Sequence, residues 1–315
     1  MTDSWYAAHT HHWADWSLPA LLRAKEAAGT RISLVLPARD EAATVGRLVG
    51  RLRAALVEEA GLLDEVVVID SDSTDDTAAV AAAAGAAVHR AAEVRPDLGT
   101  VPGKGEALWK SLFVTSGDVL VFMDADLVDW GTHFVPGLVG PLLTNPAVHL
   151  VKGFYDRPLL AGRDGPDQEG EGGRVTELVA RPALALLFPA LAGVVQPLAG
   201  EWAVRRAHMT SLRVPTGYAV DLAALVDTVS QLGLEAVAQV DLGRRAHRHQ
   251  ALRDLGPMAL QCLAALQARA GLVAPDPVAL RQFRATPDGT TMTVRDVPLT
   301  ERPPAGPLLE TEGSA

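Results

Sequence analysis

The stretch Val119–Trp130 reads VLVFMDADLVDW, and it predicts a buried strand that ends abruptly in two carboxylates. An apolar run of strand length comes first, and Asp124 and Asp126 follow on alternate positions. Burial favours the apolar run, whereas a carboxylate needs water, a cation or a hydrogen-bond donor. Open α/β folds place ligands at the carboxyl ends of their strands. One interpretation is therefore a divalent-cation site, and the other is a strand that ends in a solvated turn.

Composition restricts the class of protein. The 315 residues are 48% apolar, enough for a sizeable core, and they carry a formal net charge of −10. Such an acidic chain is a poor general nucleic-acid binder, because the phosphate backbone attracts a basic surface. The single cysteine, Cys262, excludes an intrachain disulfide and a cysteine-based zinc site. Its apolar neighbours predict a buried position.

No segment predicts secretion or membrane insertion. The N-terminal residues lack the basic and apolar regions of a signal peptide. The longest apolar candidate, 182–199, is interrupted by Pro189 and Pro197, so it predicts a buried helix rather than a membrane span. We therefore expect a soluble cytoplasmic protein with no membrane partner. No spacing groups the N-terminal histidines at 9, 11 and 12 with carboxylates, and we interpret them as surface residues.

Strand-like and helix-like segments alternate along the chain. Strands are expected at 32–36, 65–70, from 88, at 119–123, 148–154 and 237–242. Helical patterns follow several of them, as in VGRLVGRLRAALV after the first. Such alternation predicts right-handed βαβ units, and hence an α/β fold with a mostly parallel sheet flanked by helices.

Polar residues follow the predicted strands. Pro37–Glu41, Asp70–Ser71 and Asp124–Asp126 come at strand ends, and the carboxyl ends of parallel strands share one edge of a sheet. We therefore expect these residues and Lys104 to converge. The set suits a sugar nucleotide, with a lysine and a divalent cation for the pyrophosphate. Hard oxygen ligands such as Asp126 select Mg²⁺ or Mn²⁺.

Lys104 lies in a Gly/Pro loop, RPDLGTVPGKGE, at 95–106. Gly103 and Gly105 would let the backbone approach a bound group closely, and Lys104 supplies a point charge for a phosphate. The loop lacks the spacing and the following hydroxyl of a Walker loop. A plain flexible loop is the alternative.

Two segments of the second half carry cations. Gly173, Arg174, Val175 and Thr176 precede a helical pattern and predict an anion site at a helix N-terminus, with an ordinary cap as the alternative. Residues 244–249 form the densest cationic cluster, and a histidine from it would complete the metal coordination. The Gly-rich residues 161–173 predict a mobile loop, and residues 301–315 predict disorder.

These motifs resemble a known family. The order VLPARDE (35–41), VVVIDSDSTDDT (66–77), VPGKGEALWKSL (101–112) and VFMDADL (121–127) resembles the nucleotide-sugar half of the GT-A glycosyltransferases. More narrowly, GGRVTELVARP, QPLAGEWAVRR, GYAVDLAALVD and RAHRH resemble the actinobacterial glucosyl-3-phosphoglycerate synthases. The resemblance implies a Rossmann-like sheet with a C-terminal helical and loop subregion for the acceptor. It also implies retaining transfer of glucose from UDP-glucose to the 2-hydroxyl of 3-phosphoglycerate, with Mg²⁺ or Mn²⁺, by a homodimer that associates through its C-terminal helices.

The resemblance also assigns residues. Those that hold the donor nucleotide are Pro37, Ala38, Arg39, Glu41, Asp70, Ser71, Lys104, Asp124 and Ala125. Those that hold the acceptor are Gly173, Arg174, Val175, Thr176, Arg245 and His249. The metal ligands are Asp126 and His247, and the residues assigned to catalysis are Asp221, Asp126 and Lys104. The corresponding segments are a helical lead-in (1–30), a donor half (31–155), an acceptor half (156–272) and a C-terminal extension (273–315).

The sequence leaves the family pattern at the donor loop, which reads PARDE where PALNE is usual. It also has Asp221 where a glutamate is usual, and His249 where an asparagine is frequent. The alternatives are a related transferase that uses GDP-mannose or a polyprenyl phosphate acceptor, and a non-catalytic sensor of nucleotide sugars. We expect front-side displacement, with a double displacement through Asp221 as the other route.

Overall fold

The computed structural model describes residues 2–156, 173–245, 252–273, 275–287 and 289–310. The strands are β1 (Thr10–His12), β2 (Ile32–Ala38), β3 (Glu65–Asp70), β4 (Ala87–Arg90), β5 (Val119–Phe122), β6 (Leu150–Asp156), β7 (Trp202–Arg205), β8 (Val214–Pro215), β9 (Val237–Arg244), β10 (Val278–Thr286), β11 (Gly289–Val297) and β12 (Glu301–Arg302). The helices are α1 (Thr2–His9), α2 (Leu18–Ala28), α3 (Val45–Leu52), α4 (Thr77–Ala83), α5 (Lys104–Ser111), α6 (Phe134–Thr144), α7 (Arg181–Leu187), α8 (Arg206–Met209), α9 (Val220–Leu232), α10 (Leu255–Arg269) and α11 (Gly306–Glu310).

Eight of the described strands form one sheet in the order β1-β9-β6-β7-β5-β2-β3-β4. Every pairing is parallel except those of β7, which runs antiparallel to both β5 and β6. The mostly parallel sheet expected from the sequence is therefore confirmed. The strand β7 was not predicted, because a short WAVR segment has no clear alternation of apolar and polar residues.

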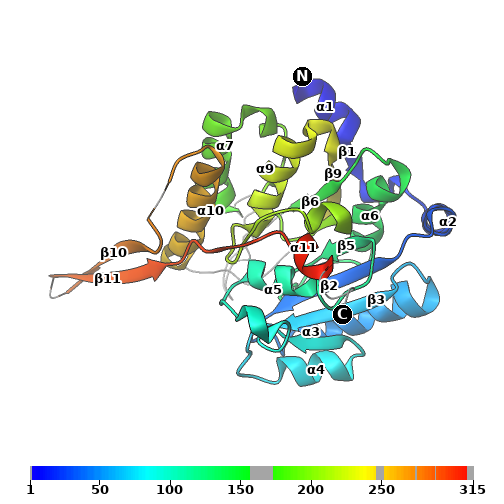
Figure 1. The fold of residues 1–315 in the computed structure, drawn as a ribbon, viewed down its shortest axis with the longest axis horizontal. Coiled ribbons are helices and arrows are strands. Elements are labelled where there is room, and N and C mark those ends of the chain that lie inside the picture. Colours follow the sequence, from blue (N-terminus) through cyan, green and yellow to red (C-terminus); the bar gives the residue numbers. More distant parts are fainter. Residues whose placement is uncertain (1, 157–172, 246–251, 274, 288, 311–315) are drawn as a thin grey trace.

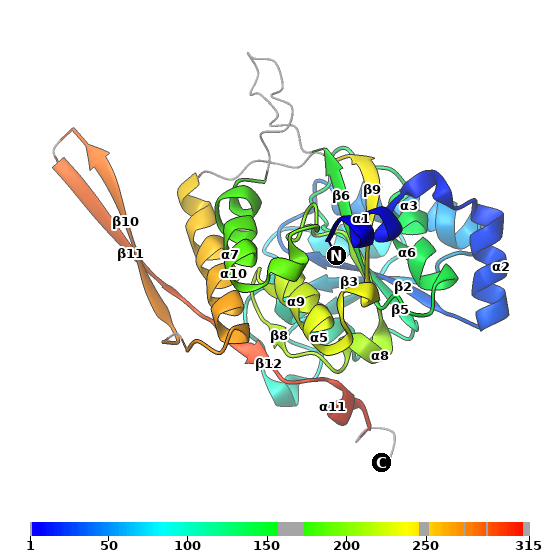
Figure 2. The same ribbon diagram turned by 90° about the horizontal axis from the view of Figure 1, so that it is seen from above.

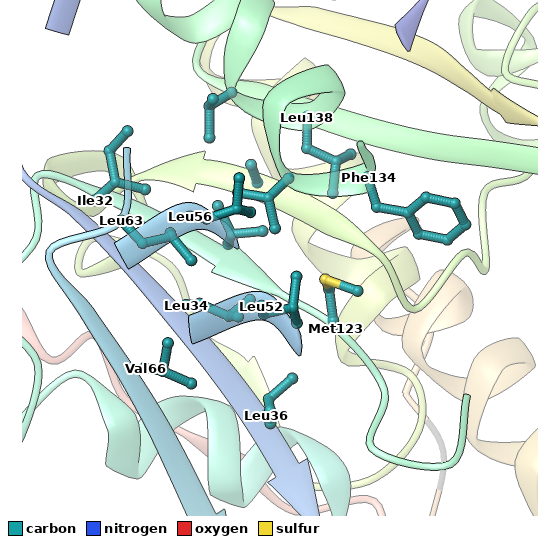
Figure 3. Close-up of a cluster of buried hydrophobic side chains, with 14 of the residues drawn as sticks. Ile32, Leu34, Leu36, Leu52, Leu56, Leu63, Val66, Met123, Phe134 and Leu138 are labelled. Atoms are coloured by element: carbon teal, nitrogen blue, oxygen red, sulfur yellow. The ribbon is translucent and has the colours of Figure 1, made fainter. Parts of the chain in front are cut away.

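Helices cover both faces of the sheet (Figure 1). Successive residues of β2 point to opposite faces, so that Leu34 and Leu36 join one apolar cluster and Val35 joins the other. The first cluster includes residues of α2, α3 and α6, and Figure 3 shows Leu52, Met123 and the two β2 leucines within it. Residues of α5, α7, α9 and α10 contribute to the second cluster. Strand β5 is buried on both faces, and for this reason its sequence is continuously apolar.

The sheet includes strands from both halves of the predicted division, because β6, β7 and β9 follow β5. The exact segment boundaries stay a prediction. The N-terminal lead-in is helical as expected, but β1 also adds a parallel edge strand beside β9. His9 is 9% exposed and its Nε2 lies 3.2 Å from Glu235, so the expectation of a surface position is wrong for this histidine.

The C-terminal extension is ordered over most of its length. Strands β10 and β11 form a hairpin that projects from the body (Figure 2), and β12 pairs antiparallel with β8. The predicted disorder is therefore wrong for 301–310, while 311–315 and residues 161–172 of the mobile loop expected at 161–173 lie outside the described residues. Arg302 explains the order, because its guanidinium donates to the buried Glu106 carboxylate at 2.6 and 2.7 Å. None of the described helices is long and apolar enough to cross a bilayer.

Candidate active site

A cavity of about 590 Å³ opens where β2 and β5 end, and the first turns of α5 and α9 also border it. Almost every predicted site residue that the structure describes lines this cavity. These residues are Pro37, Ala38, Arg39, Glu41, Ser71, Lys104, Asp124, Ala125, Asp126, Gly173, Arg174, Val175, Thr176, Asp221 and Arg245. The lining brings together Pro37–Arg39, Ser71, Lys104 and Asp124–Asp126, which the sequence predicted to converge, and the roles of these residues stay predictions.

Asp70 is the exception among the described site residues. It ends β3, is 2% exposed, and does not belong to the cavity lining. Its Oδ2 accepts a hydrogen bond from Ser73 N at 3.4 Å, while Oδ1 has no hydrogen-bond partner in the described part of the chain. The predicted contact of Asp70 with the nucleotide stays a prediction.

The donor loop after β2 is fixed by the loop after β3. Asp40 N donates to Ser73 Oγ at 2.9 Å, and Asp40 Oδ1 accepts from Thr74 N at 2.7 Å. Asp40 has a φ of +57°, which aspartate tolerates better than most residues. The departure at position 40 therefore joins the two loops, and the adjacent Arg39 lines the cavity.

Lys104 bridges two carboxylates in the cavity wall. Its Nζ lies 2.8 Å from Asp124 Oδ1 and 2.9 Å from Asp221 Oδ2. Burial alone would lower the pKa of Lys104, but Asp124 and Asp221 outweigh it and hold the pKa above its usual range. The other Asp221 oxygen accepts from Trp202 Nε1 at 2.7 Å. Both oxygens of Asp221 are thus engaged by cationic or neutral donors that fix the side chain.

Asp126 has the environment of a cation ligand. Its Oδ1 is buried and has no hydrogen-bond donor among the described residues. Burial, followed by the neighbouring charge of Asp124, raises the pKa of Asp126 to about 6. A buried oxygen without a donor, next to a second carboxylate, is what a bound divalent cation would satisfy. The residues present therefore fit Mg²⁺ or Mn²⁺.

Arg245 lies beside these carboxylates. Its Nη2 is 2.7 Å from Asp124 Oδ2 and 3.9 Å from Asp126 Oδ1, and its Nε donates to Glu201 Oε1 at 3.1 Å. Glu201 is fully buried and also accepts from Tyr155 Oη at 2.6 Å. The guanidinium therefore neutralises the buried Glu201 and the partly exposed Asp124 next to the predicted metal site. Arg245 also lines the cavity, and its predicted contact with the acceptor stays a prediction.

The segment Gly173–Thr176 begins a helix, as the sequence predicted, which runs through the π-helical residues Thr176–Ala180 into α7. Glu177 N donates to Gly173 O at 3.0 Å, which closes the first helical turn at the cavity wall. Val175 and Thr176 are buried, while Gly173 and Arg174 are partly exposed. Backbone N–H groups at such a helix start attract an anion, and Arg174 adds a positive charge.

The histidines of the predicted site, His247 and His249, lie outside the described residues. Among the residues described, no group of three histidine, cysteine or carboxylate side chains gathers as a full ligand set. The roles of His247 and His249 in metal and acceptor binding stay predictions. The predicted buried position of Cys262 is confirmed, and it also borders the cavity.

Sequence reasoning missed a part of the cavity wall. The missed residues include Tyr155, Leu198, Gly200, Tyr218, Met258, Gln261, Arg295, Asp296, Val297 and Pro298. The hairpin base and α10 have no polar motif that indicates a site, so only the tertiary structure places them here. Gly200 lies in QPLAGEW, which is part of one of the segments that carry the family resemblance.

A mostly parallel sheet with a cavity at its carboxyl edge and paired aspartates after β5 defines a nucleotide-sugar glycosyltransferase of the GT-A class. Consistently, the model of glycosyl transferase family 2 matches residues 33–181. A glucosyl-3-phosphoglycerate synthase of Mycolicibacterium smegmatis is 47% identical over 304 residues, which cover 96% of this chain and 98% of that protein. The chain belongs to the glucosyl-3-phosphoglycerate synthase family.

Solved structures agree with this assignment. The Mycobacterium tuberculosis glucosyl-3-phosphoglycerate synthase in complex with Mn²⁺, UDP and phosphoglyceric acid has a TM-score of 0.85 and 44% identity, covering 96% of this chain and 98% of that one. Its complex with Mn²⁺ and UDP-glucose has a TM-score of 0.83 and 44% identity, with 96% and 97% covered. Its complex with Mg²⁺ and UDP has a TM-score of 0.84 and 44% identity, with 95% and 99% covered.

Proposed function

We propose that this chain transfers glucose from UDP-glucose to the 2-hydroxyl of 3-phosphoglycerate, with retention at the sugar and with Mg²⁺ or Mn²⁺. The observation that carries the proposal is the single cavity shared by two sets of groups. One set consists of the donor loops, Lys104 and the paired aspartates. The other is the helix start with Arg174 and Thr176, which suits a small phosphorylated acid.

On the donor side, the loops after β2 and β3 hold the nucleotide, and Lys104 faces its diphosphate. Asp126, together with His247, would hold the cation. The cation supplies positive charge for the departing diphosphate when it is bound. Lys104 remains protonated at neutral pH because Asp124 and Asp221 surround it, so it adds a fixed positive charge beside the leaving group.

On the acceptor side, the helix start at Gly173–Thr176 and the guanidinium of Arg174 bind the negative charges of 3-phosphoglycerate. His249 would add a further contact. The protein carries a net negative charge, so the binding of a small anion requires local basic groups such as these.

Asp221 favours front-side displacement over a covalent intermediate. A carboxylate nucleophile needs a free oxygen that faces the sugar, whereas Trp202 and Lys104 engage both oxygens of Asp221. We assign two roles. Asp221 orients Lys104, and the leaving phosphate deprotonates the acceptor hydroxyl.

The direct test is a screen of donors and acceptors with and without metal. We expect UDP release from UDP-glucose that depends on both 3-phosphoglycerate and Mg²⁺ or Mn²⁺. Faster turnover with GDP-mannose, or with another phosphorylated acceptor, would replace the proposed substrates. Nucleotide binding without turnover on any acceptor would instead favour the non-catalytic sensor.

We also propose that the enzyme is a cytoplasmic homodimer. The hairpin supports the dimer, although the family resemblance had implied association through the C-terminal helices. Phe283 and Met292 are opposite each other in the hairpin register, and Val294 lies on the same face. These side chains are 60%, 54% and 48% exposed. A two-stranded hairpin is marginally stable alone, and a second copy would present the same self-complementary face to it.

Cell fractionation tests the proposed cytoplasmic location.

A further inference from the structure

The loop that carries Lys104 packs backbone against backbone on residues 215–217. Gly105 N donates to Gly217 O at 3.2 Å, and Glu106 N donates to Thr216 O at 2.9 Å. A Cβ atom at Gly105 would overlap Pro215 O. From the sequence, the glycines beside Lys104 were expected to let the backbone approach a bound group closely. The structure instead uses Gly105 for close approach of the protein's own backbone.

The C-terminal residues form a third layer behind these two segments. Strand β12 pairs with β8, and Thr216 N donates to Thr300 O at 3.0 Å. Trp109 Nε1, from the middle of α5, donates to Pro303 O at 2.8 Å. In Figure 1 the chain runs from the hairpin back across the body toward α11. The C-terminal extension therefore supports both segments that border Lys104.

Arg302 links this extension to the helix that begins at Lys104. Its Nε donates to Glu106 Oε2 at 2.7 Å and its Nη2 donates to Oε1 at 2.6 Å, which is the strong forked geometry of an arginine–carboxylate pair. Glu106 is 1% exposed, so its negative charge depends on a buried counter-charge. Arg302 also stacks on Trp109, with 5.0 Å between the guanidinium carbon and the ring centre.

The same arginine holds the loop that leads into α5. Its Nη1 donates to Leu98 O at 2.9 Å, and its Nη2 donates to Gly99 O at 3.2 Å. Lys110, from the inner side, donates to Gly99 O at 2.8 Å and to Arg95 O at 3.0 Å. The two cations fix the loop from opposite sides, so the start of α5 has little freedom to shift.

We propose that Arg302 is a positioning residue for Lys104. Through Glu106 it fixes the first turn of α5, and that turn places the Lys104 ammonium between Asp124 and Asp221. Arg302 is outside the cavity lining, so it acts through Glu106 and not on a substrate. The inference rests on the proposed function, in which Lys104 faces the donor diphosphate.

The test compares Arg302→Gln with Arg213→Gln. Arg213 is the matched control. It pairs at 3.1 Å with Glu301, which belongs to the same extension, but its side chain is 71% exposed. For Arg302→Gln we expect UDP binding in the presence of Mg²⁺ to weaken about tenfold and the KM for UDP-glucose to rise accordingly, as expected for a displaced contact group. The KM for 3-phosphoglycerate should stay within about twofold. The control should change neither constant.

Loss of Arg302 also removes the forked donor of the buried Glu106 carboxylate, which lowers stability by itself. The double variant Glu106→Gln/Arg302→Met removes both charges and also removes the link. We expect its melting temperature to return toward that of the unmodified chain while UDP binding stays weak. Recovery of UDP binding together with stability would overturn the proposal, as would unchanged UDP binding in Arg302→Gln.

These outcomes are separate from those of the proposed function. If the unmodified chain binds UDP but transfers no glucose to 3-phosphoglycerate, the proposed acceptor reaction is wrong. The comparison of UDP affinities between the variants still decides the role of Arg302 in that case.

Discussion

Asp126 is the residue whose environment points most directly to a cation, because its buried Oδ1 has no donor among the described residues. We expect Asp126→Ala to lower turnover by about two to three orders of magnitude, the scale of losing one preorganised stabiliser of charge. Initial rates over a range of Mn²⁺ concentrations provide the measurement. Near-normal rates with metal still required would place the cation elsewhere.

Arg174 tests the acceptor side. In its proposed role, Arg174 binds the acceptor equally in the ground state and the transition state, so Arg174→Ala should raise the KM for 3-phosphoglycerate about tenfold with little change in kcat. Arg181→Ala is the control, because Arg181 pairs with Glu177 at 2.9 Å and does not line the cavity. An unchanged KM in the Arg174 variant would remove this residue from the acceptor site.

Gly200 tests how tightly the paired aspartates are held. A Cβ atom at this position would overlap the Asp124 carboxylate, so Gly200→Ala must displace Asp124 from Lys104 and Arg245. We expect turnover to fall by at least about tenfold, as misplacement of an active-site group does. Gly50→Ala is the control, because Gly50 lies within α3 with open space around it. It should retain activity and gain about 0.5–1 kcal/mol of stability.

At the scale of elements, α8 and α9 are joined by a buried histidine. His208 Nε2 lies 2.9 Å from Thr228 Oγ1, and burial, with the nearby His149, lowers the pKa of His208 to about 4. The unfolded chain therefore binds more protons than the folded chain below pH 6.5, the ordinary pKa of histidine. The free energy of unfolding should fall as the pH drops from about 6.5 toward about 4.

Urea unfolding at a series of pH values measures this effect. His208→Gln should flatten the stability profile over that interval, because no group at the position then changes its protonation. His89→Gln, on strand β4, is the comparison, because it makes the same substitution outside the contact between α8 and α9. A steep loss of stability that persists in the His208 variant would assign the effect to other groups.

The elements differ in how far their own sequence predicted them. Strand β5 was predicted because it is buried on both faces, and such a strand must be continuously apolar. Strand β7 was missed, since it is stabilised by its pairing with β5 and β6 and by burial of Trp202 rather than by a local pattern. Strand β12 was missed for the same reason, because its order depends on β8 and on Glu106.

At the scale of the whole molecule, the exposed apolar face of the hairpin predicts self-association. We expect the 33.2 kDa chain to sediment at twice its mass at micromolar concentration. Phe283→Glu should shift it toward the monomer, because a charge would be buried in the interface. Thr291→Glu, on the opposite face of the same hairpin, should leave the dimer intact. A monomeric unmodified chain would contradict the proposed assembly.

Sequence patterns were enough to predict the class of fold and the edge of the sheet where the cavity opens. Strand and helix periods are local properties, and parallel strands necessarily bring their carboxyl ends, with Asp124, Asp126 and the donor loops, to one edge. The pairing of the charged side chains follows only from the tertiary structure. Lys104 lies between Asp124 and Asp221, and Arg245 meets Glu201, although these partners are far apart in the chain. Ion pairs between distant segments have no period in the sequence. Asp124 and Asp126, which follow β5, therefore acquire their partners only when the start of α5 and the end of β9 are assembled beside them.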